Sequence, residues 1–330
     1  MDLAYPKQLK LAHLPTPIQK LDTLSAEYNT NIWVKRDDLT GSVSSGNKIR
    51  KLEFSLARAK EQGADVLVTC GGIQSNHCRA TAVLGAQLGF KVHLVLRGER
   101  PDQVEGNLFL DHLAGAEISY FSPRYFNARL DFIVQEISDE YRTEGKTPYF
   151  ITTGASDATG VWGYINAAQE IAEQEKQLGV DFDTIVCATG SGGTQAGLTA
   201  GSILCGLETQ VLGIAVCDDE EYFMKKVRRD ILEWKQLYRL DFDLRHLKIN
   251  VNDKYIGPGY AKATPDVFST IERAMRKEGL ALDPVYTGKA FHGLLSEIRE
   301  GNLETENVLF IHTGGIFGLL AQREEYFAQL

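Results

Sequence analysis

The chain has 330 residues, of which 43% are hydrophobic and 24% are charged. These proportions are typical of a globular protein and exclude a disordered or fibrous chain, while the length allows one large or two ordinary α/β domains. The formal net charge of −9 argues against a protein that binds nucleic acid or an anionic membrane surface.

The N-terminal region and the cysteines predict a cytoplasmic protein. No apolar run approaches the roughly 18 residues of a membrane span, and residues 1–17 lack the charged-then-apolar order of a signal peptide. The five cysteines are odd in number and form no C-x-x-C pair, as expected of free thiols in a reducing compartment. We therefore expect a cytoplasmic protein with neither nucleic-acid nor membrane partners.

Short apolar runs alternate with helical patterns along most of the chain. A strand is expected at 32–34 and a helix at 49–62, where apolar side chains recur at helical spacing and Gly63 supplies the stop. Further strands and helices are expected in alternation at 64–70, 79–89, 91–98, 107–113, 118–121, 130–141, 148–152, 154–178, 183–188, 194–204 and 211–216. This rhythm predicts βαβ units on mainly parallel sheets, in which ligands bind beyond the carboxyl ends of the strands.

A charged helix is expected after the last of these strands, at roughly 219–240. Its first part, residues 218–230, reads D-D-E-E-Y-F-M-K-K-V-R-R-D. Mixed charges at helical spacing usually lie on a solvated helix face. We therefore predict that this segment forms a solvated helix face.

The stretch S-S-G-N-K-I-R-K-L-E, residues 44–53, places Lys48 at the start of the first long helix. A lysine held in such a position can leave water and attack a carbonyl carbon, as Schiff-base lysines do. Most lysines at helix starts are solvated surface charges instead. The position alone does not decide between these two interpretations.

Five turns at strand ends are candidate ligand sites, and they lie at 45–48, 71–77, 153–157, 189–194 and 312–315. In T-G-S-G-G-T, residues 189–194, glycines allow the backbone to approach an anion closely. The N–H groups at the start of the following helix favour a phosphate there. The turn matches neither a Walker loop nor the dinucleotide fingerprint. A tight turn with close helix packing is the alternative.

Two further segments carry polar groups suited to binding. The turn Q-S-N-H, residues 74–77, presents amides and a hydroxyl that suit a carboxylate or a phenolic oxygen, although Ser75 could instead cap a helix without a ligand. In residues 282–290, Tyr286 could be part of the core and Lys289 a surface amine. The histidines show no metal-ligand spacing, so no metal site is expected.

The order of six motifs resembles that of the D-cysteine desulfhydrase and 1-aminocyclopropane-1-carboxylate deaminase family of pyridoxal-phosphate enzymes. The resemblance extends from about residue 15 to residue 315, and the motifs are S-G-N-K-I-R-K-L-E, I-Q-S-N-H, T-G-S-G-G-T-Q-A-G, G-P-G-Y, D-P-V-Y-T-G-K-A and I-H-T-G-G.

The family resemblance implies an α/β protein of the tryptophan-synthase-β-like architecture (fold type II), with two open, mostly parallel α/β domains. Residues 1–50 and 160–330 would form a large cofactor-binding domain, and residues 51–159 a small domain that closes over the substrate. The cofactor, pyridoxal 5'-phosphate, would lie in the cleft between the domains. The protein is expected to be a homodimer that acts on a small amino acid.

The resemblance also implies residue roles. Lys48 would hold the cofactor covalently and move the substrate's α-proton, and Ser75 and Tyr286 would be the other catalytic residues. Lys51 and the glycine loop would bind the phosphate, and Asn76 the ring hydroxyl. The expected cofactor contacts are Lys48, Lys51, Asn76, Gly190, Ser191, Gly192, Gly193, Thr194, Tyr286, Thr287 and Thr313. The expected substrate contacts are Gln74, Ser75, Asn76, His77 and Tyr260.

Two positions distinguish activities within the family. The ring-opening deaminases resemble D-P-V-Y-E-G-K, in which a glutamate keeps the pyridine nitrogen protonated. Here Thr287 takes its place and is expected only to share a hydrogen bond. Thr313 likewise resembles the desulfhydrases, because the deaminases tend to carry leucine there. A weaker electron sink suffices when a good leaving group departs from Cβ.

The resemblance therefore implies a carbon-sulfur lyase that works by β-elimination. The expected activity is that of a D-cysteine desulfhydrase, which converts D-cysteine to pyruvate, ammonia and hydrogen sulfide. The alternatives are an L-cysteate sulfo-lyase, a 1-aminocyclopropane-1-carboxylate deaminase, and a pyridoxal-phosphate-binding protein without turnover.

Overall fold

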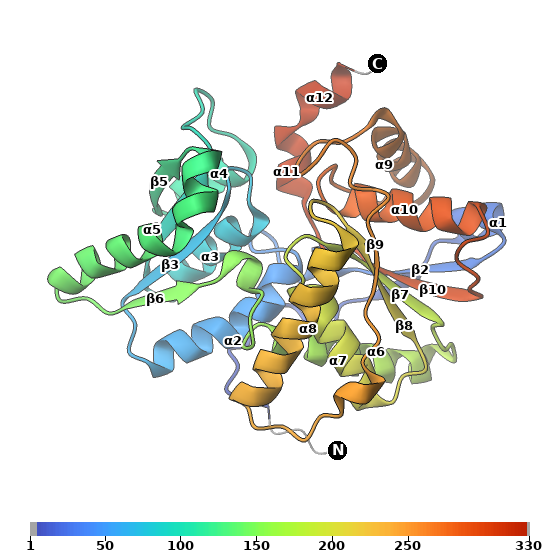
Figure 1. Cartoon of the computed structure of the whole chain (residues 1–330). Helices are drawn as coiled ribbons and strands as arrows, with labels where there is room; N and C mark the ends of the chain where they lie inside the picture. Colours follow the sequence, from blue (N-terminus) through green and yellow to red (C-terminus); the bar gives the residue numbers. More distant parts are fainter. Residues whose placement is uncertain (1–4, 329–330) are drawn as a thin grey trace.

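Two sheets form the framework of the chain, and the computed structural model describes them within residues 5–328 (Figure 1). The larger sheet has six strands in the order β1-β2-β10-β7-β8-β9, and all of its neighbouring pairs are parallel except β1 with β2. Its strands are β1 (Ile18–Lys20), β2 (Asn31–Lys35), β10 (Asn307–Ile311), β7 (Thr184–Thr189), β8 (Gln210–Ala215) and β9 (Asn250–Asn252).

The smaller sheet has four parallel strands in the order β5-β4-β3-β6. They are β5 (Glu117–Phe121), β4 (Lys91–Arg97), β3 (Val66–Gly72) and β6 (Pro148–Ile151). The expected α/β class with two open, mostly parallel sheets is therefore confirmed. The described residues contain no helix that is both long and apolar enough to cross a membrane, and all five cysteines are free thiols.

Helices cover both sheets. Side chains of α2 (Asn47–Glu61), α3 (Asn76–Gln87) and α4 (Gly106–Leu113) share a core with one face of the smaller sheet, and α5 (Pro123–Thr143) packs on the other. The remaining helices are α1 (Asp22–Tyr28), α6 (Val161–Leu178), α7 (Gly193–Cys205), α8 (Glu220–Leu237), α9 (Pro265–Glu278), α10 (Thr287–Arg299), α11 (Ile316–Ala321) and α12 (Arg323–Phe327), and three 3-10 turns lie at Asp37–Leu39, Thr153–Ala155 and Leu244–His246.

The larger sheet is buried on both faces, which explains why its strands read as continuous apolar runs. Val186 and Phe310 belong to the core under α9 and α10, whereas their neighbours Ile185 and Leu309 belong to the core under α6 and α7. Side chains along a strand alternate between faces, so both members of each adjacent pair are buried. Two layers of helices thus hold the strand ends that form the site.

Two helices begin at residues other than those expected. α5 begins at Pro123 because the side chain of Ser122 accepts a hydrogen bond from the backbone N–H of Tyr125 and so caps the helix. α6 begins only at Val161, because Gly154 and Ala155 have positive φ angles of 69° and 47° that no α-helix accommodates. The segment before α6 is therefore a turn at the carboxyl end of β6.

The expected domain ranges each contain one sheet. The four-stranded sheet lies within residues 51–159, and the strands of the six-stranded sheet lie within 1–50 and 160–330. The boundary at residue 50 cuts through α2, which packs against both α6 and α3. The division into two domains, and the closure of one over the substrate, remain a prediction.

A buried ion-pair network fixes α2 to the larger sheet. Arg50 of α2 pairs with Asp37 at 2.8 Å and with Glu170 of α6 at 2.9 Å, and Lys35 of β2 also pairs with Glu170. Burial alone would raise the pKa of Asp37, but the charge and hydrogen bonds of Arg50 hold that pKa below its usual value. The network therefore joins β2, α2 and α6 beneath the start of α2.

Replacing Arg50 with leucine is expected to lower the free energy of unfolding by about 3–5 kcal/mol, because the buried Asp37 loses its ion-pair partner and keeps only the hydrogen bonds from Thr16 and Tyr164. Urea unfolding followed by circular dichroism measures this change. As a control, Arg142→Leu removes an exposed ion pair with Asp139 and is expected to leave the midpoint unchanged. A wild-type midpoint for Arg50→Leu would contradict the stabilising role of the network.

Candidate active site

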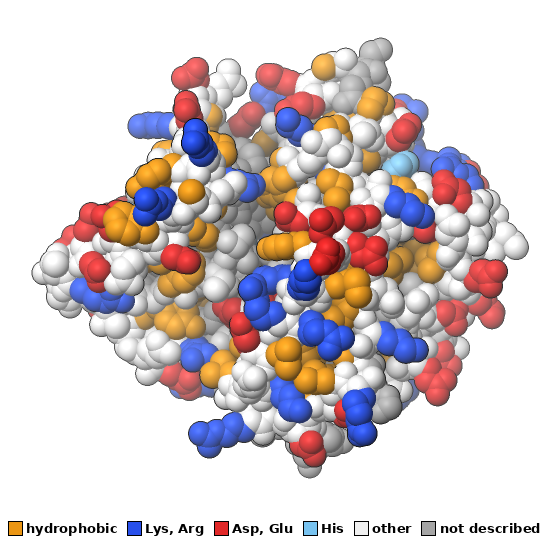
Figure 2. Space-filling model, viewed as in Figure 1, with side chains coloured by type: hydrophobic (Ala, Val, Ile, Leu, Met, Phe, Trp, Pro, Cys, Tyr) orange, Lys and Arg blue, Asp and Glu red, His pale blue; other side chains and the backbone are white. Residues whose placement is uncertain are grey.

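A cavity of about 590 Å³ lies between the two sheets, and the space-filling view shows it as a hollow between the two lobes (Figure 2). Its volume falls within the roughly 300–1,000 Å³ of small-molecule sites. Residues at or just beyond the carboxyl ends of β3, β4, β6 and β7 line it, together with the starts of α2, α3 and α7. This is where parallel sheets bind ligands.

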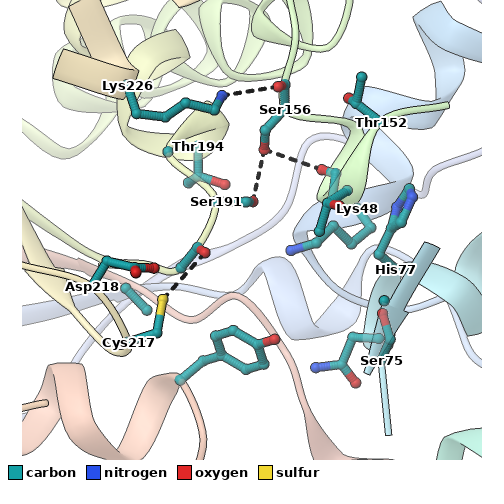
Figure 3. A pocket seen from close by; sticks show the side chains of 18 of the residues that line it. Lys48, Ser75, His77, Thr152, Ser156, Ser191, Thr194, Cys217, Asp218 and Lys226 are labelled. Atoms are coloured by element: carbon teal, nitrogen blue, oxygen red, sulfur yellow. Dashed lines mark hydrogen bonds between the residues drawn. The ribbon is translucent and has the colours of Figure 1, made fainter. Parts of the chain in front are cut away.

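Most of the predicted site residues line this one cavity. They are Lys48, Ser75, Asn76, His77, Gly190, Ser191, Gly192, Thr194, Tyr260, Tyr286 and Thr313. Lys51, Gly193, Gln74 and Thr287 are not among its lining residues. Figure 3 shows Lys48 and His77 on one side of the cavity, across from Asp218 and Lys226.

Lys48 is placed by a close approach of two backbone turns. Gly46, which precedes α2, has a φ of 107°, and a Cβ added there would lie 2.8 Å from the carbonyl oxygen of Thr313. The N–H of Asn47 donates to that same oxygen at 3.0 Å. Only glycine permits this conformation and contact, so the S-G-N-K and H-T-G-G motifs are held together at the start of α2.

The amine of Lys48 is not a solvated surface charge. It donates to Oδ1 of Asn47 at 2.9 Å and lies 5.9 Å from the ring centre of Tyr286. Burial, assisted by the positive charge of Arg79, lowers the pKa of Lys48 to about 8, although Asp283 acts in the opposite direction. A substantial neutral fraction near neutral pH makes this amine a competent nucleophile and base.

The glycine loop leads into α7, and Lys51 approaches it from α2. A Cβ added to Gly193 would lie 2.9 Å from Nζ of Lys51 and 2.6 Å from Oγ of Ser156, so the loop has no room for a side chain there. Nζ of Lys51 donates to Oγ of Ser156 at 3.1 Å. Burial, reinforced by the charge of Lys48, lowers the pKa of Lys51 well below its ordinary value.

This donor set fits a phosphate group. The N–H of Gly193 and the hydroxyl of Ser191 also meet Oγ of Ser156, at 3.2 and 2.7 Å (Figure 3). A helix start, a buried amine and several hydroxyl groups thus converge where no carboxylate among the described residues pairs with Lys51. A bound anion would stabilise the protonated form of Lys51 and would accept hydrogen bonds from the N–H groups at the start of α7. The tight turn expected as the alternative is present as well, so the two interpretations are compatible.

α8 takes part in the cavity, and the prediction of a purely solvated face for residues 218–230 is wrong. Lys226 and Asp230 form a largely buried ion pair one helical turn apart. Nζ of Lys226 also donates to the carbonyl oxygen of Ser156 at 3.1 Å (Figure 3). A Cβ added to Gly192 would lie 3.1 Å from Cγ of Lys226. One face of this charged helix therefore packs on the glycine loop.

The two tyrosines of the site contact each other. Their hydroxyl oxygens, in Tyr260 and Tyr286, are 2.5 Å apart. The loop that carries Tyr260 is held by Lys289, whose Nζ donates to the carbonyl oxygens of Ile256 and Gly259 at 2.6 and 2.7 Å. Lys289 is fully buried, so the suggestion of a surface amine is wrong. This lysine positions the tyrosine loop.

The turn before α3 divides its polar groups between structure and cavity. Ser75 caps α3 by accepting from the N–H of Cys78 at 3.2 Å, as the ligand-free alternative expected, and it also lines the cavity. Gln74 points elsewhere, because its amide bonds the carbonyl of Glu105 at 3.0 Å and the N–H of Asn107 at 2.8 Å. The predicted substrate contact of Gln74 is therefore not supported: its side chain positions α4.

Asn76 and His77 leave polar atoms for a ligand. Oδ1 of Asn76 accepts from the side chain of Asn107 at 3.1 Å, which leaves the amide N–H groups of Asn76 to donate elsewhere. Nε2 of His77 meets Oγ1 of Thr69 at 2.7 Å, while its buried Nδ1 has no hydrogen-bond partner among the described residues. Burial lowers the pKa of His77 well below its ordinary value, so the ring is neutral.

Thr287 does not line the cavity, and its expected contact with the cofactor remains a prediction. Its hydroxyl donates to Oδ1 of Asp283 at 2.7 Å and accepts from the N–H of Asp283 at 2.8 Å. Thr287 is fully buried and closes the turn before α10. Thr313, the other neutral residue expected here, does line the cavity.

Sequence reasoning missed several lining residues. Ser156 lies in the T-G-A-S-D turn, which was recognised as a candidate ligand site without a role for any residue. Arg97 ends a predicted strand, and Cys217 follows another, so their strand-end positions were the available signal. Within residues 5–328, no group of three or more His, Cys, Asp or Glu side chains is arranged to hold a metal ion.

Comparisons with known proteins match this arrangement. Residues 9–314 match the family model described as "Pyridoxal-phosphate dependent enzyme". A putative 1-aminocyclopropane-1-carboxylate deaminase of Thermotoga maritima is 45% identical over 96% of this chain and 98% of its own length. The mitochondrial bifunctional D-cysteine desulfhydrase/1-aminocyclopropane-1-carboxylate deaminase of Arabidopsis thaliana is 42% identical over 94% of this chain and 78% of its own.

A solved structure described as an ACC deaminase homologue superposes with a TM-score of 0.91, at 39% identity and with 98% of this chain and 96% of that chain covered. The resemblance inferred from the six motifs is thereby confirmed, and so is the fold type. The chain belongs to the pyridoxal-phosphate-dependent enzymes, and its cofactor is pyridoxal 5'-phosphate.

Proposed function

We propose that this enzyme catalyses β-elimination from a small amino acid with a leaving group on Cβ, and that its substrate is D-cysteine. The products are pyruvate, ammonia and hydrogen sulfide. The observation that carries the proposal is the presence of two neutral residues: Thr313, where the deaminases tend to carry leucine, lines the cavity with Tyr286, and Thr287 stands where the deaminase pattern has a glutamate. The Arabidopsis relative, whose name includes D-cysteine desulfhydrase, supports it.

Lys51, the start of α7, Ser191 and Thr194 bind the phosphate of the cofactor. When bound, pyridoxal phosphate withdraws electrons from Cα of the amino acid and so makes its α-proton acidic. Nζ of Lys48, whose pKa is lowered to about 8, would hold the cofactor, and its neutral amine would take this proton from Cα. The start of α3, with Ser75 and Asn76, binds the substrate carboxylate.

The tyrosine pair also lies near Lys48, whose Nζ is 5.9 Å from the ring centre of Tyr286. The hydroxyl groups of Tyr260 and Tyr286 share a hydrogen bond, and burial raises the pKa of Tyr286 well above its ordinary value. Tyr286 therefore stays protonated and donates a hydrogen bond rather than carrying a charge. It orients the substrate next to the amine of Lys48 while the walls of the cleft exclude water.

Ring-opening deamination is the second candidate, because the names of the Thermotoga and Arabidopsis relatives both include it. An L-cysteate sulfo-lyase would use the same residues on a different leaving group. A protein that only binds the cofactor would not need a lysine with a lowered pKa beside two tyrosines. One panel of substrates separates these activities.

The wild-type enzyme is expected to release pyruvate from D-cysteine and β-chloro-D-alanine faster than from L-cysteine or L-cysteate. It should yield little 2-oxobutyrate from 1-aminocyclopropane-1-carboxylate. Coupled lactate dehydrogenase assays measure both keto acids. Faster formation of 2-oxobutyrate would reverse the assignment, a preference for L-cysteate would identify the sulfo-lyase, and no turnover of any substrate would indicate a cofactor-binding protein.

Lys48→Ala is expected to reduce kcat for D-cysteine by about a thousandfold or more with little change in melting temperature, because its amine acts in the chemistry and not in the core. Lys225→Ala is the matched control, since Lys225 is exposed and pairs with Glu221. Retention of wild-type kcat by Lys48→Ala would assign the proton transfer to another group.

The reaction of Lys48 with pyridoxal in cofactor-free protein is expected to accelerate as pH rises and to be half-maximal near pH 8. Only the neutral amine attacks an aldehyde, and burial lowers the pKa of this lysine to about 8. Borohydride trapping and mass spectrometry of the Lys48 peptide measure the rate. The peptide of Lys225 serves as reference, because Glu221 raises the pKa of that lysine. A half-maximum above pH 10 would show that Lys48 is solvated.

We further propose that the enzyme is a cytoplasmic homodimer. Exposed apolar side chains of α4 and of α11 and α12 support the dimer, and α4 contacts α11. They are Phe109, Leu113, Ile316, Leu320 and Phe327. Sedimentation at twice the mass of one chain, and at one chain mass for Leu320→Glu, is expected in analytical ultracentrifugation. A wild-type protein that sediments as a single chain would contradict the dimer.

A further inference from the structure

Arg97 places a positive charge in the cleft beside the tyrosine pair. It is the last residue of β4 and lies next to Gly72, the last residue of β3. Its side chain lines the cavity, and Cζ of its guanidinium group lies 5.2 Å from the ring centre of Tyr260. Stacking on an aromatic ring holds the guanidinium group in a defined place.

Among the residues that the structure describes, no carboxylate lies within ion-pair distance of this charge, although Arg97 is half-buried. Arg50, by contrast, is paired with two carboxylates, Asp37 and Glu170. Removing a guanidinium group from water without a partner is unfavourable. The cleft therefore presents a site for an anion at Arg97.

The position of Arg97 indicates which anion this is. The phosphate has Lys51 and the start of α7, and the substrate carboxylate has the start of α3. Arg97 instead stacks on Tyr260 in the cavity wall, the hydroxyl of Tyr260 contacts that of Tyr286 at 2.5 Å, and the ring centre of Tyr286 lies 5.9 Å from Nζ of Lys48. A substrate whose Cα is beside Lys48 can thus extend its side chain along the tyrosines toward Arg97.

We propose that Arg97 binds the group that departs from Cβ and stabilises the negative charge that this group acquires. The inference rests on the proposed β-elimination. Lys48 takes the α-proton, the electron pair of that bond forms the Cα–Cβ double bond, and the Cβ–S bond breaks with its electron pair moving to sulfur. The sulfur leaves as hydrosulfide, opposite the guanidinium charge. A fixed positive charge that meets developing negative charge lowers the barrier without reorganisation.

The expected substrate class follows from this geometry. Arg97 stabilises groups that leave as anions of weak acids, such as hydrosulfide, mainly in the transition state, and this raises kcat. Substrates whose Cβ group is already anionic, such as a sulfonate or a carboxylate, are instead bound more tightly by the resting enzyme. Chloride is a good leaving group by itself and needs little help.

The test compares Arg97→Gln and Arg97→Lys with the control Arg100→Gln, which removes the same charge from an exposed position just after β4. Arg97→Gln is expected to reduce kcat/KM for D-cysteine by about 100-fold and to leave β-chloro-D-alanine nearly unchanged. Arg97→Lys should recover part of the loss, and Arg100→Gln should behave as the wild type. An equal loss for both substrates, or none for D-cysteine, would overturn the proposal.

A binding measurement tests the anion site without turnover. The holoenzyme is titrated with D-alanine and with D-aspartate, whose Cβ carries a carboxylate that does not leave, and the cofactor absorbance reports each dissociation constant. The wild type is expected to prefer D-aspartate, and Arg97→Gln to lose this preference. No preference in the wild type would overturn the anion site. A wild type that prefers D-aspartate but eliminates nothing, even from β-chloro-D-alanine, would refute the proposed function and leave the site standing.

Discussion

The buried ion pairs of Arg50 are the interaction on which the active site depends. They join α2 to the turn after β2 and to α6, and the residues on either side of Arg50 face the cavity and the glycine loop. Lys48 reaches the cleft two residues before Arg50, and Lys51 reaches the loop one residue after it. A shift of this helix would displace both amines together. The charge network is therefore part of the geometry of catalysis, although none of its members lines the cavity.

Three basic side chains in and beside the cleft form no ion pair among the described residues, although Asp157, Asp218, Asp230 and Glu233 also line the cavity. Lys48, Lys51 and Arg97 converge on it, and burial lowers the pKa of both lysines. Such an arrangement is costly in an empty site and favourable once anions bind. Phosphate, substrate carboxylate and leaving group are each negative, so the protein presents one donor set for each part of the bound molecule. The overall charge of −9 does not foretell this.

The local sequence predicted which motifs meet in the cavity better than it predicted where single side chains point. Lys48, the glycine loop and Tyr286 were assigned correctly to one cavity because glycine turns at strand ends restrict where their neighbours can lie. Gln74 and Thr287 do not line the cavity, since their polar groups bond α4 and Asp283, and their contacts with substrate and cofactor remain predictions. No local pattern distinguishes a side chain that caps a turn from one that binds a ligand, because both use the same hydrogen-bonding groups.

By itself, the sequence determined the α/β class, the order of the motifs and the family, because hydrophobic periodicity and glycine turns are local properties of the chain. Only the tertiary structure decided which distant groups meet. Ser156 joins Lys51, Lys226 and the glycine loop, and Arg97 comes to lie beside Tyr260, 163 positions later in the chain. These contacts depend on the packing of helices and strands far apart in sequence, so no window of the chain contains them.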